Sequence, residues 1–279
     1  MARPFPVLLT FDLDAESGAL AQDPANADRP GVLSIGQYGA RVGVFRLLRL
    51  LERHRVPATF FVPGWVVDRY PDAVAAIHAG GHEVAHHGYT HQAPASQTPD
   101  EERRSLELGI ASIERVTGRR PEGYRSPSWD FSPQTLNLLK ECGFLYSSNF
   151  MDHDGPYEHM NGIVELPVQW LLDDAPFFLF RPPYSRPISG LSVAYETWSE
   201  EFQALYDEHQ SPAPPVPGQA PEHGKSFVLT MHPQLIGRPS RVAMLDRLIH
   251  FIQDFEGARF LRCADAARLW LKGEAGPVA

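Results

Sequence analysis

The chain has 279 residues, of which 43% are hydrophobic and 21% charged, a balance typical of a folded globular protein with a sizeable core. Its formal net charge of −9 argues against a nucleic acid or an anionic membrane as a partner. Its two cysteines, Cys142 and Cys263, are too few for a disulfide framework, and no apolar run is long enough for a signal peptide or a membrane span, so we expect a reduced, cytoplasmic protein.

Short apolar runs and segments of helical periodicity alternate along the chain. The run "FPVLLTF" predicts a buried strand, whereas Val44, Leu47 and Leu51 recur with the spacing of one helix face. The stretch "TPDE" at 98–101 has the form of a capping box that opens a helix. The predicted strands are 5–11, 58–62, 82–86, 122–126, 144–150, 162–170, 225–231 and 258–263. The predicted helices run through 44–51, 70–79, 99–113, 132–143, 193–209 and 242–252, and a short one follows the last strand.

Two long segments interrupt this alternation. Residues 17–40 are predicted to form a loop insertion, of a length that is usually functional or disordered. Residues 181–225 form a second insertion, in which a helix precedes the proline-rich stretch "SPAPPVPGQAPEHG", predicted to be an extended surface linker or lid. We expect a single catalytic domain over 1–272 and a flexible tail at 273–279.

Strands that alternate with helices predict an α/β fold with a parallel sheet. An open doubly wound sheet and a closed barrel both fit the pattern. The number of predicted strands favours the barrel, and no glycine-rich phosphate turn follows the first strand. In either architecture, we expect active residues at the C-terminal ends of the strands.

Reactive side chains do follow four of the predicted strands. They are Asp12 and Asp14 after the first, His87 and His91 after the third, Arg125 at the fourth and His232 at a late one. Asp12 and Asp14 share one face of a strand, where like charges repel unless a cation lies among them. Because His87 and His91 are four residues apart, they can bind one ion together with an aspartate. The sequence therefore predicts one divalent metal ion, zinc or another first-row ion.

The remaining side chains suit hydrolysis. One aspartate serves as a metal ligand, and the other can act as the general base toward a water molecule activated by the ion. Arg125 can orient that base through a bidentate contact, although a surface ion pair is an alternative role for it. His232 can act as the general acid for a leaving nitrogen, with a buried structural histidine as the alternative.

Four motifs resemble, in order, those of the polysaccharide deacetylase family. They are "TFDLD", "HHGYTH", "RSPSW" and "LTMH". The resemblance implies a distorted (β/α) barrel of about seven parallel strands, one bound divalent metal ion and hydrolysis of an amide C–N bond. It also implies roles for six residues. Asp12 would be the base, Asp14, His87 and His91 the metal ligands, Arg125 the carrier of the third motif and His232 the acid.

Two details of the resemblance stay open. Family members usually have two adjacent aspartates, but Leu13 separates them here, so the roles of Asp12 and Asp14 could be exchanged. The family also has an aspartate that tunes the acid histidine. The candidates for it are Asp152, Asp154, Asp173 and Asp174.

The segments "SIGQYGARVGVFRLLRLLE" and "ELPVQWLLDD" resemble one branch of that family, which includes cyclic imide hydrolases, metal-independent allantoinases and peptidoglycan deacetylase-like proteins. Members of this branch are often oligomeric, so a homo-oligomer is one possible state of this chain. We expect hydrolysis of a small cyclic imide or amide, in a pocket that four aromatic residues could line: Tyr38, Trp65, Trp129 and Trp170. The rival hypotheses are N-deacetylation of peptidoglycan or an N-acetylated oligosaccharide, and a non-catalytic binding protein on the same fold.

Overall fold

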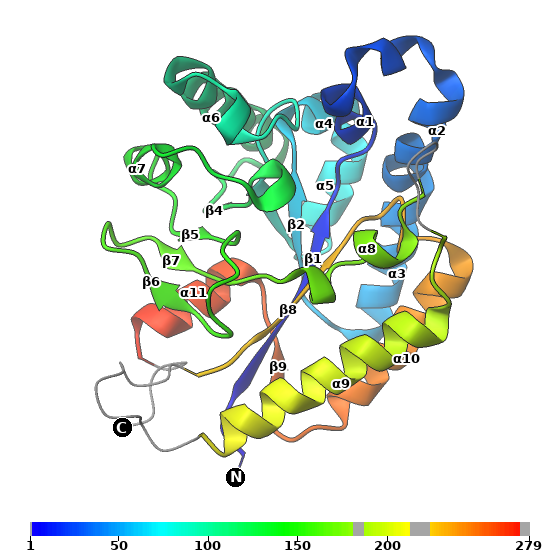
Figure 1. The fold of residues 1–279 in the computed structure, drawn as a ribbon, viewed down its shortest axis with the longest axis vertical. Coiled ribbons are helices and arrows are strands. Elements are labelled where there is room, and N and C mark those ends of the chain that lie inside the picture. The colour runs from blue at the N-terminus through cyan, green and yellow to red at the C-terminus, as the bar shows by residue number, and fades with distance from the viewer. Residues whose placement is uncertain (1, 181–186, 213–223, 274–279) are drawn as a thin grey trace.

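A curled sheet forms the centre of the molecule, and helices pack outside it (Figure 1). The computed structural model describes residues 2–180, 187–212 and 224–273. Within these residues the sheet has nine strands, in the order β6-β7-β5-β4-β3-β2-β1-β8, with β9 also paired to β1. The strands are β1 Phe5–Asp12, β2 Thr59–Val62, β3 Glu83–His86, β4 Gly123–Tyr124, β5 Tyr146–Ser147, β6 Tyr157–Glu158, β7 Val164–Glu165, β8 Phe227–Met231 and β9 Ala258–Phe260.

Apart from the antiparallel pair β6–β7, all strand pairs are parallel. An isolated bridge joins Asp173 to Thr230 of β8, so the segment that follows β7 returns to the other edge of the sheet. The predicted distorted barrel of mostly parallel strands is therefore confirmed, in the form of a curled half-barrel. The described residues hold nine strands rather than about seven, because the short antiparallel strand β6 joins one edge and β9 pairs with the N-terminal part of β1.

Helices cover the outside of the sheet and follow the strands in chain order. The α-helices are α1 Ser17–Gln22, α2 Pro30–Tyr38, α3 Val44–His54, α4 Gly64–Arg69, α5 Pro71–Ala79, α6 Pro99–Thr117, α7 Thr135–Glu141, α8 Ala175–Phe178, α9 Leu191–Gln210, α10 Pro239–Gln253 and α11 Cys263–Leu271. Shorter turns are η1 Pro24–Asp28, η2 Gly39–Gly43, η3 Pro94–Ser96, η4 Pro127–Trp129 and η5 Trp170–Leu172. The predicted capping box is present at Thr98 and Glu101.

The alternation of side chains along β1 explains how the strand serves both the core and the site. Phe5, Val7 and Leu9 belong to the apolar cluster shared with the helices. Leu8 belongs to a second cluster, formed with residues of other strands inside the curled sheet. Because alternate residues of a strand point to opposite faces, Asp12 shares the inner face with Leu8.

The prediction of a long loop at 17–40 is wrong. This segment folds into α1, η1 and α2 and continues through the π-helical turn η2 into α3. Glycines in this segment permit close helix packing. A Cβ atom on Gly36 would lie 2.1 Å from the carbonyl oxygen of Ala15, so only glycine lets α2 approach the chain beyond β1.

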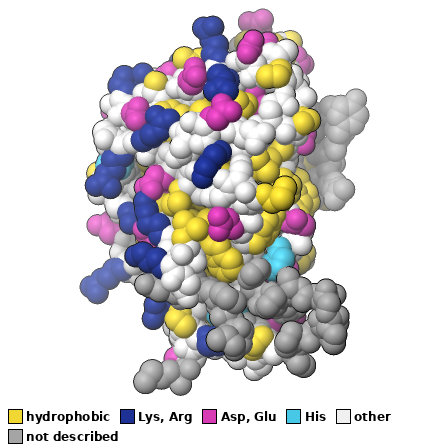
Figure 2. All heavy atoms as spheres, turned by 90° about the vertical axis from the view of Figure 1, so that its left-hand side faces the viewer, with side chains coloured by type: hydrophobic (Ala, Val, Ile, Leu, Met, Phe, Trp, Pro, Cys, Tyr) yellow, Lys and Arg dark blue, Asp and Glu magenta, His cyan; other side chains and the backbone are white. Residues whose placement is uncertain are grey.

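The second insertion matches its prediction in part. The predicted helix is present as α9. Most of the proline-rich stretch and of the tail at 273–279 lies outside the described residues. No helix in the described part of the chain has the length and apolar character needed to cross a membrane. Figure 2 shows the side formed by α6, α7 and β6, where basic and acidic side chains are interspersed around hydrophobic areas.

Candidate metal centre and active site

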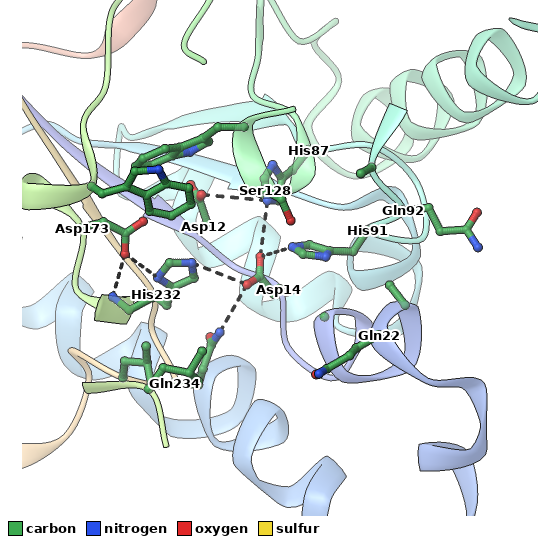
Figure 3. Close-up of a pocket in the computed structure, with 18 of the residues that line it drawn as sticks. Asp12, Asp14, Gln22, His87, His91, Gln92, Ser128, Asp173, His232 and Gln234 are labelled. Carbon is green, nitrogen blue, oxygen red and sulfur yellow. Dashed lines mark hydrogen bonds and ion pairs between the residues drawn. The ribbon is translucent and has the colours of Figure 1, made fainter. Parts of the chain in front are cut away.

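Asp14 lies at the centre of a polar cluster beyond the C-terminal end of β1 (Figure 3). Its Oδ1 atom is 3.5 Å from His87 Nε2 and 3.4 Å from His91 Nε2. His87 comes directly after β3, and His91 stands four residues later with a positive φ of 63°. His232, the residue after β8, places its Nε2 atom 3.7 Å from Asp14 Oδ2. The strand ends thus gather the residues that the sequence singled out.

Three features of this cluster fit a divalent metal ion. Asp14 Oδ1 is buried without a hydrogen-bond partner, which is unfavourable for a carboxylate unless a cation or a water completes it. His87 Nδ1 lies 2.7 Å from the backbone carbonyl oxygen of Arg125, which fixes the ring and leaves Nε2 to bind an ion. One ligand atom each of Asp14, His87 and His91 lies within 4.8 Å of the others. Two imidazoles and one carboxylate are a donor set that first-row divalent ions accept.

The histidines also set the ionisation of Asp14. Burial alone would raise the pKa of this carboxyl group. The charge of His91 and the nearby Nε2 atoms of His87 and His91 outweigh that effect and hold its pKa well below the usual range. Asp14 is therefore in the carboxylate form that a metal ion requires.

Asp12 is held by a fully buried guanidinium group. Arg125 Nη1 donates to Asp12 Oδ1 at 2.9 Å and to Thr10 Oγ1 at 2.8 Å. The Nη2 atom donates to Ser148 Oγ at 2.9 Å, and the guanidinium carbon lies 4.1 Å from the centre of the Phe61 ring. The expected bidentate contact between Arg125 and Asp12 is thus wrong, because Nη2, the second terminal nitrogen, binds Ser148 instead. The surface ion pair is also excluded, because Arg125 is 0% exposed.

His232 is oriented by one of the four aspartates that the sequence left open. Its Nδ1 atom lies 2.6 Å from Asp174 Oδ1, and its backbone N–H donates to Asp174 Oδ2 at 3.0 Å. Asp173 Oδ1 is 3.8 Å from the same Nδ1 atom. Burial would lower the pKa of His232, but the carboxylates of Asp174 and Asp173 raise it well above its usual value. Burial raises the pKa of Asp173 to about 7.

The other two candidate aspartates have partners elsewhere. Asp152 accepts a hydrogen bond from Tyr157, and Asp154 accepts one from Lys225. Asp174 is therefore the residue whose position fits the tuning of the acid histidine. Sequence alone could not select it, because the choice depends on the bridge that brings this segment to β8.

A cavity of about 490 Å³ opens beside Asp12, Asp14 and His232. Trp129 and Trp170 line it and pack against each other, with ring centroids 4.4 Å apart. Ser128 and Trp129 both have positive φ angles, of 61° and 54°. Two consecutive non-glycine residues in this region store backbone strain, which is often found at functional sites.

The structure does not bring the other two predicted aromatic residues to this cavity. Tyr38 donates to the carbonyl oxygen of Gly237 at 3.1 Å, and the guanidinium carbon of Arg238 lies 3.5 Å from the centre of its ring. Trp65 packs against the apolar core instead. Neither is among the residues that line the cavity.

Gln234 is a cavity residue that the sequence reasoning missed. Its Nε2 atom donates to Asp14 Oδ2 at 3.4 Å, and its Oε1 atom is buried without a partner. The only sequence signal was its position two residues after His232. A glutamine in a loop is too common to be selected on that ground.

Comparisons with known proteins agree with this geometry. The family model described as polysaccharide deacetylase matches residues 35–147. A crystal structure from Mycobacterium smegmatis, assigned as a polysaccharide deacetylase, is 39% identical over 100% of this chain and 94% of that chain, with a TM-score of 0.89. The peptidoglycan deacetylase of Helicobacter pylori is 29% identical over 98% of each chain. The crystal structure of PuuE allantoinase is 25% identical over 98% of this chain and 92% of that chain, with a TM-score of 0.82.

Proposed function

Because this chain belongs to the polysaccharide deacetylase family, we propose that it hydrolyses an amide C–N bond, in a small cyclic imide or amide. The cavity carries the proposal. Its volume of about 490 Å³ falls in the range of small-molecule sites. Gly18 and Ala21 of α1 line the cavity together with Trp129 and Trp170. Its walls are therefore formed by a helix and by a pair of indole rings. A planar ring can lie against the indoles.

Asp14, His87 and His91 would hold the metal ion, and zinc fits this donor set. Such an ion, when bound, polarises a carbonyl oxygen and lowers the pKa of water. Gln234 would steady Asp14 through its hydrogen bond to Oδ2.

Asp12 would act as the general base. Arg125 holds Asp12 Oδ1, and Asp12 Oδ2 lies 3.9 Å from His87 Nε2, facing the ligand group. From this position Oδ2 can accept the proton of a water molecule that attacks the substrate carbonyl. Arg125 keeps the base oriented and does not itself need to touch the substrate.

His232 would act as the general acid. Asp174 binds its Nδ1 atom, so Nε2 is the atom that delivers a proton into the cavity. The raised pKa of His232 keeps that proton in place at neutral pH. Transfer of this proton from His232 Nε2 to the departing nitrogen completes the cleavage of the C–N bond.

N-deacetylation of an N-acetylated sugar is the second candidate. It is favoured by the similarity to the Helicobacter pylori peptidoglycan deacetylase along nearly the whole chain. The same residues would serve, because both reactions cleave an amide. A cytoplasmic location and a homo-oligomeric state stay predictions.

The test is mass spectrometry on one mixed incubation of metal-loaded protein with succinimide, dihydrouracil and a chitin oligomer. The proposal predicts that a ring compound gains one water. The Asp12→Asn protein, loaded in the same way, serves as the control for a contaminating activity. Loss of an acetyl group from the oligomer would favour the second candidate. No change in any compound, with metal bound, would leave a narrower amide substrate or a binding protein.

A further inference from the structure

A second group of metal-binding side chains lies where α3 ends against α10. His54 is the last residue of α3, and Asp246 and His250 stand four residues apart on α10. Residues with this spacing are neighbours on one face of a helix. One ligand atom from each of the three lies within 4.8 Å of the others. None of them lines the cavity beside Asp14.

The hydrogen bonds in this group orient both imidazoles. His54 Nε2 lies 2.6 Å from Asp246 Oδ1, and its Nδ1 is 3.3 Å from Gln253 Oε1. His250 Nδ1 lies 2.9 Å from the backbone carbonyl oxygen of Asp246, which leaves Nε2 as the atom that can bind an ion. The two rings are close, with centroids 4.5 Å apart. Metal-binding histidines commonly have their second nitrogen fixed by an oxygen in this way.

We propose that His54, Asp246 and His250 bind a divalent transition-metal ion such as zinc at a second site, separate from the catalytic one. Two imidazoles and a carboxylate are a suitable donor set. His54 Nε2 and Asp246 Oδ1 are 2.6 Å apart, closer than the roughly 3–4 Å expected between two ligands of one zinc ion, so the bound ion would separate them. The exposed His250 can rotate to complete the donor set.

Such an ion would link two distant parts of the chain. His54 and Asp246 are separated by 192 positions, and their side chains meet only through tertiary packing. A ligand that binds the folded state and not the unfolded one raises stability by mass action. The second site would therefore stabilise the contact between α3 and α10 without taking part in catalysis, so the inference does not depend on the proposed reaction.

Nearby arginines oppose the binding of a cation. Arg53 Nη2 lies 3.4 Å from Asp246 Oδ1, and Arg55 lines the same surface pocket of about 450 Å³. The side chain of Arg53 is 65% exposed, so it can move away when the carboxylate binds an ion. Removal of its charge should strengthen metal binding, whereas removal of a ligand should weaken it. Opposite changes in metal affinity for the two substitutions would distinguish a specific site from unspecific binding to the surface.

The experiment uses the full chain without a polyhistidine tag, stripped of metal and carrying His87→Ala and His91→Ala to disable the catalytic site. Titration with Co²⁺ is followed by visible absorption. We expect one equivalent to bind. Addition of His250→Ala should lower the affinity at least about tenfold, and addition of Arg53→Gln should raise it. Excess zinc should raise the melting temperature of the parent and of the Arg53→Gln chain, but not that of the His250→Ala chain.

A second measurement covers the case in which the doubly substituted parent does not fold. The metal content of the wild-type chain after gel filtration in micromolar zinc should exceed that of the His250→Ala chain by one equivalent. Equal contents would overturn the proposal. So would cobalt uptake that His250→Ala leaves unchanged in the folded parent.

Discussion

Two carboxylates, Glu83 at the start of β3 and Asp14 beyond the end of β1, have opposite surroundings. Glu83, on β3, accepts hydrogen bonds from Thr59 Oγ1 at 2.9 Å, Tyr146 OH at 2.9 Å and Ala264 N at 3.0 Å. Burial raises its pKa. Asp14, beyond β1, has histidines around it, a pKa held well below the usual range and one buried oxygen without a partner.

The difference separates a structural carboxylate from a functional one. The neutral donors around Glu83 satisfy both of its oxygens, so this group needs nothing from outside the chain. The imidazoles around Asp14 are proposed metal ligands, and they leave one carboxylate oxygen unsatisfied. A buried polar group in that state costs free energy unless a cation completes it.

The largest effect should follow from His87→Ala. Loss of one imidazole leaves an incomplete donor set, so we expect metal affinity to fall by more than about 100-fold and turnover to vanish with it. Metal content by mass spectrometry and hydrolysis of the identified substrate are the two measurements. His78→Ala, on α5, is the matched control and should change neither. A His87→Ala chain that keeps its metal would remove the basis for treating Asp14 as a ligand.

Asp12→Asn should lower turnover without removing the metal ion. The amide keeps the shape of the side chain but cannot accept the proton, so we expect metal content to persist while turnover falls about 10²–10⁴-fold. Asp14→Asn is the comparison and should lower metal content. If Asp12→Asn empties the site and Asp14→Asn does not, the roles of the two aspartates are exchanged.

Glu83→Leu should show the reverse pattern. The substitution leaves the donors of Thr59, Tyr146 and Ala264 buried without their acceptor. We expect the free energy of unfolding to fall by about 3 kcal/mol, since each unsatisfied buried group costs on the order of 1–3 kcal/mol. Urea denaturation measures this loss. Metal content per folded chain should stay at the wild-type value, and a chain that keeps its stability but loses metal would contradict the comparison.

The sequence predicted that Asp14, His87 and His91 lie together, because they follow strands that apolar runs make visible. Asp14 and His87 come directly beyond such runs, and parallel strands bring their ends together whatever the loops do. The choice of Asp174 over Asp173 was not predictable, because it depends on which carboxylate meets His232 across the sheet edge. The same limit applies to the aromatic residues. Composition does not say that Trp129 faces the cavity and Trp65 the core.

The error at 17–40 has a local cause. Glycine and proline usually indicate a loop, and the sequence gives no sign of what a helix will pack against. The segment places Gly39 beside the loop that carries Gln234, and a Cβ atom there would lie 2.9 Å from Gln234 N and 3.0 Å from its Oε1. The glycine is therefore a requirement of tertiary contact, which a sequence pattern does not contain.

Gly39→Ala should have the smallest effect of these substitutions on metal binding. The added methyl group would displace Gln234, which donates to Asp14 Oδ2, so we expect metal affinity to fall severalfold. Gly31→Ala on α2 is the matched control, because a Cβ atom there meets nothing within 4 Å and alanine favours the helix by roughly 0.5–1 kcal/mol. Cobalt titration of both chains measures the difference. Equal affinities would mean that Gln234 does not steady the ligand and that the histidines alone position Asp14.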